Sequence, residues 1–297
     1  ALHKLDFNLM AKFQLTLLLT CMILISSCNR IVNTNEDWCD QELRSQYSEL
    51  QEIETSSNWF KVYLVAEGVF AIAEPFNFQE VISYLIIGND KALLFDTGMG
   101  ISSIRLVVEE LTSLPITVLN SHTHYDHIGS NYEFDNILAM NTEYTISRAE
   151  NGMAHSLVSH EVSSEAICLE RAQGFDTTAY HIKPFTITEL ISDGHIIDLG
   201  NRKLEVIASP GHTPGHMSFQ VGNTLILGDA ISNHHVAFAR PEWPSGSDQD
   251  EALAARTRAA LFDRITTDAL NIVGFHLPNG GMGRVDASGE GFTFIQG

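Results

Sequence analysis

Basic residues are scarce in this chain. Its 297 residues contain 17 Lys and Arg against 37 Asp and Glu, so the formal net charge is −20. A protein that binds nucleic acid should carry a basic patch that neutralises phosphates. The acidic balance therefore argues against nucleic acid as a partner, and it leaves small molecules as the class of substrate or ligand to consider.

Hydrophobic runs long enough to span a bilayer are also missing. The longest candidate, Phe13–Ile25, follows Lys12 and has the length of the apolar region of a signal peptide. Ile25-Ser26-Ser27-Cys28 then resembles the lipobox of bacterial lipoproteins, in which the Cys is lipidated and becomes the mature N-terminus. We expect residues 1–28 to be upstream residues and a signal peptide. The protein would then be exported, either to the periplasm or to a membrane through lipidated Cys28, with ordinary secretion and cleavage nearby as the alternative.

Cysteine is rare, with four residues in the chain. If Cys21 is removed and Cys28 is lipidated, Cys39 and Cys168 remain. They could pair in an oxidising compartment, but their separation along the chain leaves that pairing open. Neither residue has the spacing of a metal ligand.

Composition divides the remaining chain into two parts. Residues 29–58 are rich in Glu, Gln, Asn and Ser, and we interpret them as a polar tether. Part of it, Asp40–Glu54, places Leu43, Tyr47 and Leu50 at helical spacing and could be a helix. Residues 59–297 are long enough to bury a sizeable core and are expected to form one catalytic domain.

Strands and helices alternate along this domain. Apolar runs between turn residues predict strands at Phe60–Val65, Val69–Ala73, Val81–Ile87, Ala92–Phe95, Ile116–Asn120, Ile196–Asp198, Lys203–Ala208 and Thr224–Leu227. Helical spacing predicts helices at Ile101–Leu111, Thr142–Arg148, Ser163–Ala172 and Ser247–Thr266. Such alternation indicates an α/β fold with helices packed outside sheets.

Four possible metal ligands stand within six residues, directly after the predicted strand Ile116–Asn120. They are His122, His124, Asp126 and His127. Residues i and i+2 at a strand end point the same way, so the first two can converge on one ion. The other two lie in the following turn and face a neighbouring position. Burying four such groups without partners would be costly, which favours a metal site over a structural role.

This stretch resembles the H-x-H-x-D-H signature of the metallo-β-lactamase superfamily. Further parts of the superfamily pattern follow in order: Leu93-Leu94-Phe95-Asp96-Thr97-Gly98 precedes the signature, and Pro210-Gly211-His212-Thr213-Pro214-Gly215-His216, Leu225-Ile226-Leu227-Gly228-Asp229 and Gly274-Phe275-His276-Leu277-Pro278 come after it. The resemblance extends from about Trp59 to the end of the chain. It implies a four-layer αββα sandwich with the site at the strand ends.

The resemblance also implies a ligand set for two divalent metal ions, for which imidazole and carboxylate suit zinc first. His122, His124 and His212 would hold one ion. Asp126, His127 and His276 would hold the second, and Asp229 would bridge the two. Asp96 would orient a ligand imidazole or its loop, and His216 would supply supporting hydrogen bonds.

The expected reaction is hydrolysis by a hydroxide held between two metals about 3.5–4 Å apart. Asp126 and Asp229 are the predicted catalytic carboxylates, and either Asp126 or metal-bound water would protonate the leaving group. The C-terminal half is similar to the methyl parathion hydrolase branch and its lactonase-like relatives, through His276-Leu277-Pro278 and the glycine-rich turn after it. Lactones or related esters are therefore the expected substrates, with phosphotriesters as a side activity.

Three alternatives remain. A β-lactamase is disfavoured by Asp229, because metallo-β-lactamases usually lack this bridging carboxylate. A glyoxalase-II-like thioesterase would need C-terminal basic residues, whereas the last thirty residues carry Arg284 alone. A non-catalytic metal-binding surface lipoprotein would be expected to have lost ligands.

Surface or core positions are expected for the histidines His155, His160, His181 and His195. His234 and His235 could line the pocket.

Overall fold

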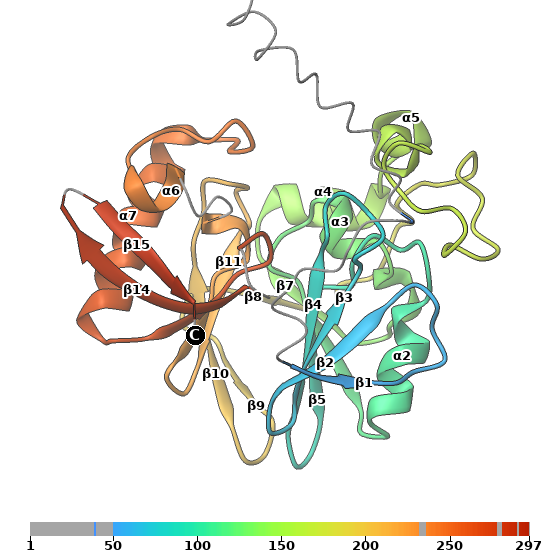
Figure 1. Cartoon of the computed structure of the whole chain (residues 1–297), viewed down its shortest axis with the longest axis horizontal. Coiled ribbons are helices and arrows are strands. Elements are labelled where there is room, and N and C mark those ends of the chain that lie inside the picture. The colour runs from blue at the N-terminus through green and yellow to red at the C-terminus, as the bar shows by residue number, and fades with distance from the viewer. Residues whose placement is uncertain (1–38, 40–49, 232–235, 278–280, 290, 297) are drawn as a thin grey trace, which may run out of the picture. The chain divides into compact units, whose positions relative to one another are not determined.

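Two β-sheets face each other in the computed structural model, which describes residue 39 and residues 50–231, 236–277, 281–289 and 291–296 (Figure 1). The earlier part of this region forms the first sheet, in chain order: β1 (Gln51–Ile53), β2 (Lys61–Ala66), β3 (Val69–Ala73), β4 (Ile82–Ile87), β5 (Ala92–Phe95), β6 (Ile116–Leu119), β7 (Ile137–Met140) and β8 (Glu189–Ile191). The later part forms the second sheet, also in chain order: β9 (Ile196–Asp198), β10 (Lys203–Ala208), β11 (Met217–Val221), β12 (Thr224–Ile226), β13 (Asn271–Val273), β14 (Met282–Ser288) and β15 (Gly291–Gln296). The chain completes one sheet before it begins the next.

Alternating side chains of these strands fill separate hydrophobic layers, because successive residues of a strand point to opposite faces. Tyr84 of β4 belongs to the cluster between the sheets, together with Phe219 of β11. Leu85, the next residue of β4, belongs to the cluster on the outer face of the first sheet. In β12, Ile226 faces inward and Leu225 faces outward. Both faces of both sheets are therefore buried.

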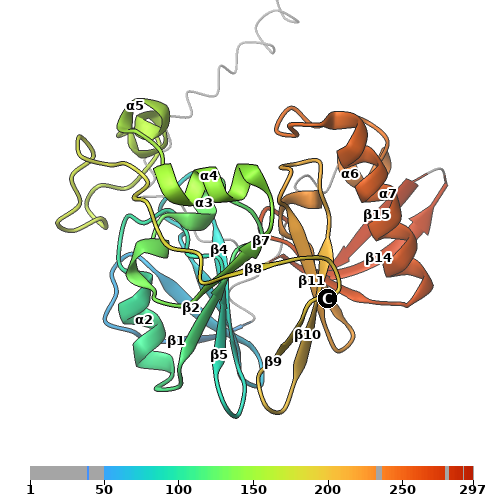
Figure 2. The ribbon, with the colours of Figure 1, turned by 180° about the vertical axis from the view of Figure 1, so that it is seen from behind.

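Helices cover the two outer faces (Figures 1 and 2). α2 (Ile104–Leu111) begins after the cap Ser103 and buries Val107 and Val108 against the first sheet. α7 (Glu251–Thr267) begins after the cap Asp250 and buries Phe262 against the second. The other helices of the described residues are α3 (Tyr125–Ile128), η2 (Asn131–Glu133), α4 (Glu143–Asn151), α5 (His155–Val158), η3 (Ser159–Val162), η4 (Gly228–Ile231) and α6 (Val236–Ala239). The predicted α/β class and its four-layer αββα arrangement are confirmed.

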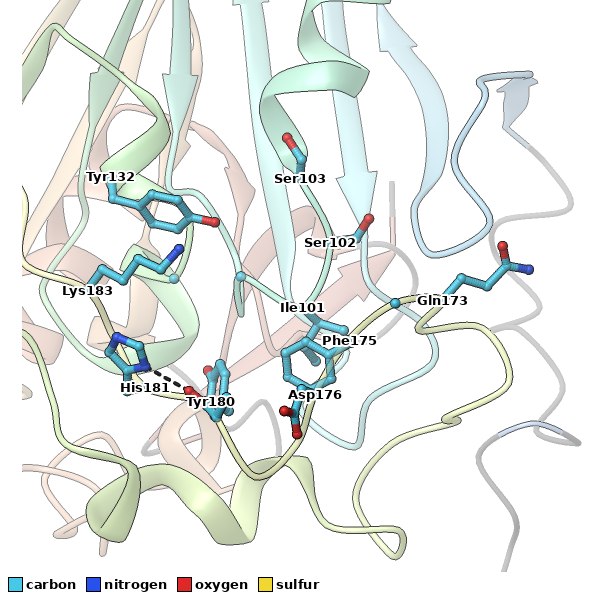
Figure 3. A pocket seen from close by; sticks show the side chains of 14 residues that line it. Ile101, Ser102, Ser103, Tyr132, Gln173, Phe175, Asp176, Tyr180, His181 and Lys183 are labelled. Carbon is cyan, nitrogen blue, oxygen red and sulfur yellow. Dashed lines mark hydrogen bonds between the residues drawn. The ribbon is translucent and has the colours of Figure 1, made fainter.

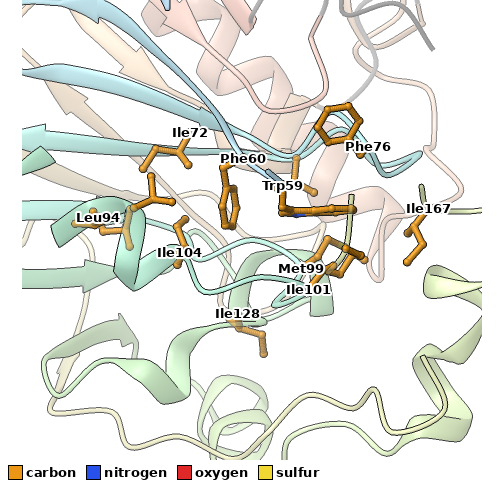
Figure 4. Packing of buried hydrophobic residues seen from close by; sticks show 14 of the residues in the cluster. Trp59, Phe60, Ile72, Phe76, Leu94, Met99, Ile101, Ile104, Ile128 and Ile167 are labelled. Carbon is orange, nitrogen blue, oxygen red and sulfur yellow. The ribbon is translucent and has the colours of Figure 1, made fainter. Parts of the chain in front are cut away.

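The hydrophobic cluster outside the first sheet anchors the loops that carry the site (Figure 4). Trp59 and Phe76 lie in it with their ring centres 6.1 Å apart. Met99, from the turn after β5, and Ile128, from the end of α3, are both buried in the same cluster. The residues just before Met99 and Ile128 are therefore held in place by apolar packing.

One predicted helix is wrong. Ser163–Ala172 consists of turns, and Ile167 makes an isolated β-bridge with Asn77. The amide of Cys168 donates to the carbonyl of Phe76 at 2.9 Å, and the amide of Phe78 donates to the carbonyl of Ala166 at 3.0 Å. Pairing with a distant segment has overridden the local helical spacing.

The end of the predicted helix Asp40–Glu54 is also wrong, because Gln51–Ile53 forms β1 and pairs with β2. Cys39 and Cys168, whose pairing was left open, form a disulfide with Cα atoms 4.7 Å apart.

The signal-peptide and lipobox prediction falls on residues that the structure does not describe, as do His234 and His235. Within the described residues, no helix is both long enough and apolar enough to cross a membrane.

Candidate metal centre

The seven predicted ligands all follow the carboxyl ends of strands. Residues 122–127 follow β6, and His212 lies in the turn after β10. Asp229 lies in η4 directly after β12, and His276 follows β13. β10, β12 and β13 run in the same direction, because β11 is antiparallel to both β10 and β12, and β12 is parallel to β13. The second sheet therefore presents its three ligands at one edge.

His122, His124 and His212 form the first group. Nδ1 of His124 lies 2.9 Å from Nε2 of His122 and 3.0 Å from Nε2 of His212. His122 and His212 are almost completely buried. Three imidazole nitrogens that converge in this way fit three ligands of one cation, as in a catalytic zinc site with an open fourth position.

Asp126, His127 and His276 form a second group beside the first. Nε2 of His127 lies 3.2 Å from Oδ2 of Asp126, and Nε2 of His276 lies 3.9 Å from the same oxygen. The ring of Phe275, buried between the sheets, meets the ring of His127 edge-on at 5.3 Å. Packing between the sheets therefore restrains the imidazole of His127.

Asp229 stands between the two groups. Its Oδ2 lies 3.3 Å from Nε2 of His276, 3.6 Å from Nε2 of His127 and 3.7 Å from Nε2 of His212. One carboxylate thus faces imidazoles of both groups. This is the position that a bridging ligand would occupy.

Oδ1 of Asp229 and Nε2 of His127 are among the buried atoms of this cluster that lack a hydrogen-bond partner within the described residues. Buried polar groups without partners are rare in folded proteins and call for an explanation. Divalent cations would supply partners for both atoms, and the mixed set of imidazoles and carboxylates suits zinc. The residues therefore fit the predicted metal ions, whose number and identity remain predictions.

The pKa values of His124 and His127, one from each group, are shifted in opposite directions. Burial, followed by the nearby His212, lowers the pKa of His124 to about 4, and burial also lowers the pKa of His122. Burial alone would lower the pKa of His127 too, but the carboxylates of Asp126 and Asp229 raise it well above its usual range. The imidazoles of the first group thus lie mainly among other histidines, whereas His127 lies among carboxylates.

Asp96 lies in the turn after β5 and contacts the ring of His127. Its φ of 60° falls in the left-handed region that residues other than glycine rarely adopt. Nδ1 of His127 donates to Oδ2 of Asp96 at 2.7 Å, and the amide of Ser121 donates to Oδ1 at 2.7 Å. This is the contact expected of a carboxylate that orients a ligand imidazole, because it turns Nε2 of His127 toward Asp126 and Asp229.

The supporting hydrogen bonds predicted for His216 are confirmed. Its Nε2 accepts from the amide of Asp229 at 2.9 Å, and its Nδ1 lies 2.8 Å from Oγ of Ser209. Burial lowers the pKa of His216 to about 3, so the ring is neutral. A neutral imidazole can accept the amide proton that holds Asp229 in place.

Glu74 is a buried carboxyl group that sequence reasoning missed. Its Oε1 accepts from the amide of Met99 at 2.8 Å and its Oε2 accepts from Nε1 of Trp59 at 2.6 Å. Gly98 leaves room for it, because a Cβ there would lie 1.8 Å from Oε1. Glu74 therefore holds the turn that begins at Asp96. No local pattern marks it, since its partners are distant in the chain.

Asp248 and Gln249 were also missed. Asp248 lies 3.4 Å from Nδ1 of His212, and Nε2 of Gln249 lies 3.4 Å from Nε2 of His124. Burial alone would raise the pKa of Asp248, but the neighbouring His212 and Arg258 hold it below its usual range. The helix cap Asp250 could have located this loop from the sequence. Its contact with the histidines could not be found in that way.

The histidines assigned to surface or core positions lie outside the metal-ligand groups found among the described residues. His181 lines a separate pocket of about 430 Å³ beside the start of α2 (Figure 3). Its Nδ1 contacts the carbonyl of Ala179 at 2.8 Å. In the same pocket, Nζ of Lys183 lies 3.7 Å from the centre of the Tyr132 ring. This pocket carries none of the seven predicted ligands.

Known proteins with related sequences are hydrolases. The human acyl-coenzyme A thioesterase MBLAC2 is 25% identical over 190 residues, which cover 58% of this chain and 67% of that protein. The probable metallo-hydrolase MJ0888 of Methanocaldococcus jannaschii is 28% identical over 194 residues, which cover 63% of this chain and 81% of that protein. Both proteins are hydrolases by description.

Among solved structures, AidC, a dizinc quorum-quenching lactonase, superposes with a TM-score of 0.52 at 18% identity. The likeness covers 84% of this chain and 97% of that chain, and at this identity it shows the fold. The sequence model described as the metallo-beta-lactamase superfamily matches residues 78–276. Because this match spans more than half of the 297 residues, the chain belongs to the metallo-beta-lactamase superfamily, and the prediction of an enzyme of this hydrolase class is confirmed.

Proposed function

We propose that the protein is a dinuclear metal-dependent hydrolase of lactones or related carboxylic esters, with phosphotriesters as a side activity. The observation that carries this proposal is the position of Asp229, whose Oδ2 lies within 3.7 Å of imidazoles from both groups. A carboxylate at this position favours two cations over one. It also favours the ester-hydrolysing branches of the superfamily over its β-lactamases.

Two divalent cations in this cradle would supply the Lewis acidity that lowers the pKa of water and polarises a carbonyl group. His122, His124 and His212 would hold one of them. Asp126, His127 and His276 would hold the other, and Asp229 would contact both. The side chain of His276 is 20% exposed, so this ligand reaches the surface.

Ester hydrolysis adds the oxygen of water to the acyl carbon, breaks the bond to the leaving oxygen and places a proton on that oxygen. Asp126 is the candidate to carry this proton, because its carboxylate is nearly buried beside His127. Asp96 would keep His127 in one orientation throughout, through the hydrogen bond to Nδ1.

Thioesters of acyl groups are a second candidate class. The observation in their favour is the sequence likeness to the acyl-coenzyme A thioesterase. Thioester and lactone hydrolysis share the attack of water on an acyl carbon, so the same cluster could serve either substrate. The two classes differ in the leaving group, a thiol or an alcohol.

The test is to measure metal content and turnover on one sample. Zinc-loaded protein would be assayed with a lactone, an aryl ester, a phosphotriester, an acyl thioester and a β-lactam, and its metal content measured by elemental analysis. We expect close to two metals per chain and turnover of lactones or esters. Turnover of the thioester alone would favour the second candidate. Hydrolysis of the β-lactam without lactone or ester turnover would sink the proposal.

Asp229→Ala separates an enzyme from a metal-binding protein without catalysis. We expect turnover to fall by roughly 100-fold or more while the circular dichroism spectrum is unchanged, because a ligand shared by both groups is lost. Unchanged turnover in this variant would contradict the dinuclear mechanism.

We also propose that the protein is exported and anchored to a membrane through Cys28. The disulfide between Cys39 and Cys168 supports export, because disulfides persist in oxidising compartments and are rare in the cytosol. Labelled fatty acid should be incorporated into the wild type and not into Cys28→Ser. Equal labelling of both proteins, or of neither, would remove the lipoprotein proposal.

A further inference from the structure

We propose that the side chains of Asp248 and Gln249 form a clamp that positions the first histidine group for its metal. We call it the 248–249 clamp. The inference rests on the proposed dinuclear function. It assigns a role to two residues that lie in the loop before α7, far along the chain from the ligands that they contact.

Asp248 fixes the ring of His212. Its Oδ1 lies 3.4 Å from Nδ1 of His212, a buried nitrogen that has no hydrogen-bond partner among the described residues. A proton on Nδ1 would be shared with the carboxylate, which leaves Nε2 with its lone pair facing His124. A carboxylate behind a ligand imidazole fixes the tautomer and raises the basicity of the ring.

Arg258 holds Asp248 in place from the first turns of α7. Nη1 of Arg258 donates to Oδ2 of Asp248 at 2.7 Å, and both side chains are almost completely buried. The rest of the guanidinium donates to the carbonyls of Pro241 at 3.1 Å and Trp243 at 2.7 Å. The carboxylate therefore has little freedom to leave His212.

Gln249 contacts the second histidine of the group. Its amide nitrogen lies 3.4 Å from Nε2 of His124 and donates to Oη of Tyr144 at 2.9 Å. Its backbone amide also donates to the carbonyl of His212 at 3.2 Å. Two of the three imidazoles are thus held from behind by adjacent residues of one loop.

Asp250 provides a matched control within the same loop. Its side chain accepts from the amide of Leu253 and caps α7, and no histidine contact is recorded for it among the described residues. Asp250→Asn removes the same charge as Asp248→Asn, and Asn is an equally good helix cap. Any general effect of charge on metal binding should appear in both variants.

The experiment is a zinc competition titration with a chromophoric chelator, on wild type, Asp248→Asn, Gln249→Ala and Asp250→Asn. His212→Ala identifies which of the two zinc equivalents belongs to the first group. We expect Asp248→Asn to weaken that equivalent by roughly 10- to 100-fold and to leave the other unchanged. Gln249→Ala should weaken the same equivalent by a smaller factor, and Asp250→Asn should match the wild type.

Thermal unfolding of the metal-free proteins separates positioning from folding. Asp248→Asn leaves Arg258 without its carboxylate and could destabilise the chain, whereas Gln249 is exposed and its truncation should leave the unfolding midpoint unchanged. Equal zinc affinities in all variants would overturn the proposed clamp. The same conclusion would follow if Asp248→Asn or Gln249→Ala weakened both zinc equivalents equally. Wild-type protein that binds no zinc would instead overturn the proposed function on which it rests.

Discussion

The buried carboxyl group of Glu74 should make the free energy of unfolding of this protein depend on pH. Burial raises the pKa of Glu74 from its usual 4.5 to about 7, although Trp59 and Met99 donate hydrogen bonds that lower it. The folded chain therefore holds this proton more tightly than the unfolded chain. The stabilisation is fully present below pH 4.5 and is lost as the pH rises toward about 7.

Glu74→Gln removes this titration. Between pH 4.5 and 7, the free energy of unfolding of the wild type should fall relative to the variant by on the order of 3 kcal/mol, from about 1.4 kcal/mol per pKa unit. Denaturant unfolding of both proteins across this range measures the difference. Parallel pH profiles would show that Glu74 does not retain a proton in the folded state.

Gly129, directly after α3, lies against the backbone of the turn after β5, and both segments carry site residues. A Cβ at this position would lie 2.1 Å from the carbonyl carbon of Met99, a backbone atom that cannot move aside freely. Gly129→Ala should therefore destabilise the protein by about 3 kcal/mol and weaken metal binding through His127. Gly246→Ala is the control, because no described atom lies within 4 Å of the added Cβ. Equal unfolding midpoints for the two variants would contradict the close backbone approach of Gly129 and Met99.

The candidate site could be predicted from the sequence where its residues are close together. His122 to His127 form a local pattern after a strand, so strand geometry alone brings them together. His212, Asp229 and His276 were found through the superfamily resemblance, because nothing local connects them to the first motif. Glu74 and Asp248 were not found at all. Each is a carboxylate whose role depends on a partner supplied by a distant part of the chain.

At the scale of elements, a disulfide joins Cys39 to the long stretch between β7 and β8. Reduction of Cys39–Cys168, or Cys39→Ser, should lower the free energy of unfolding by between about 2 and 5 kcal/mol, because the bond closes a loop of 129 residues. Denaturant unfolding with and without reductant measures this. The reductant should act on the wild type and leave Cys39→Ser unchanged. If the reductant left the free energy of unfolding of the wild type unchanged, the disulfide would be contradicted.

The same stretch shows why some elements could not be predicted. Ser163–Ala172 has helical spacing, yet Ile167 and Cys168 are drawn into the core beside Phe76 and into the disulfide. β1 was missed because its strand pairing with β2, and not its own composition, determines its structure. By contrast, β2 to β6 and α7 were predicted within a few residues, since their apolar periodicity matches the faces that they bury.

At the scale of the whole molecule, metal removal should lower stability. The ligands come from loops of both sheets, so a cation that they hold would link the two sheets. Free zinc at about 100 times its dissociation constant should add about 2.7 kcal/mol per site to the free energy of unfolding. Thermal unfolding with zinc and with a chelator tests this, with Asp229→Ala as a variant in which the shift should shrink. Identical midpoints in the two conditions would contradict a metal centre that spans the sheets.

The order of the two sheets along the chain has a consequence for biosynthesis. Among the described residues, three overlapping sets of side chains lie close enough together to hold an ion: His122, His124 and His212; His122, His127 and Asp229; and Asp126, His127 and His276. Each group takes two members from the loops of the first sheet and one from the second. A growing chain that has made only its first sheet therefore has two donors at each position and never three. A set of three donors would therefore be complete only after the second sheet has been synthesised and has docked, so uptake of the proposed ions would mark the completion of folding.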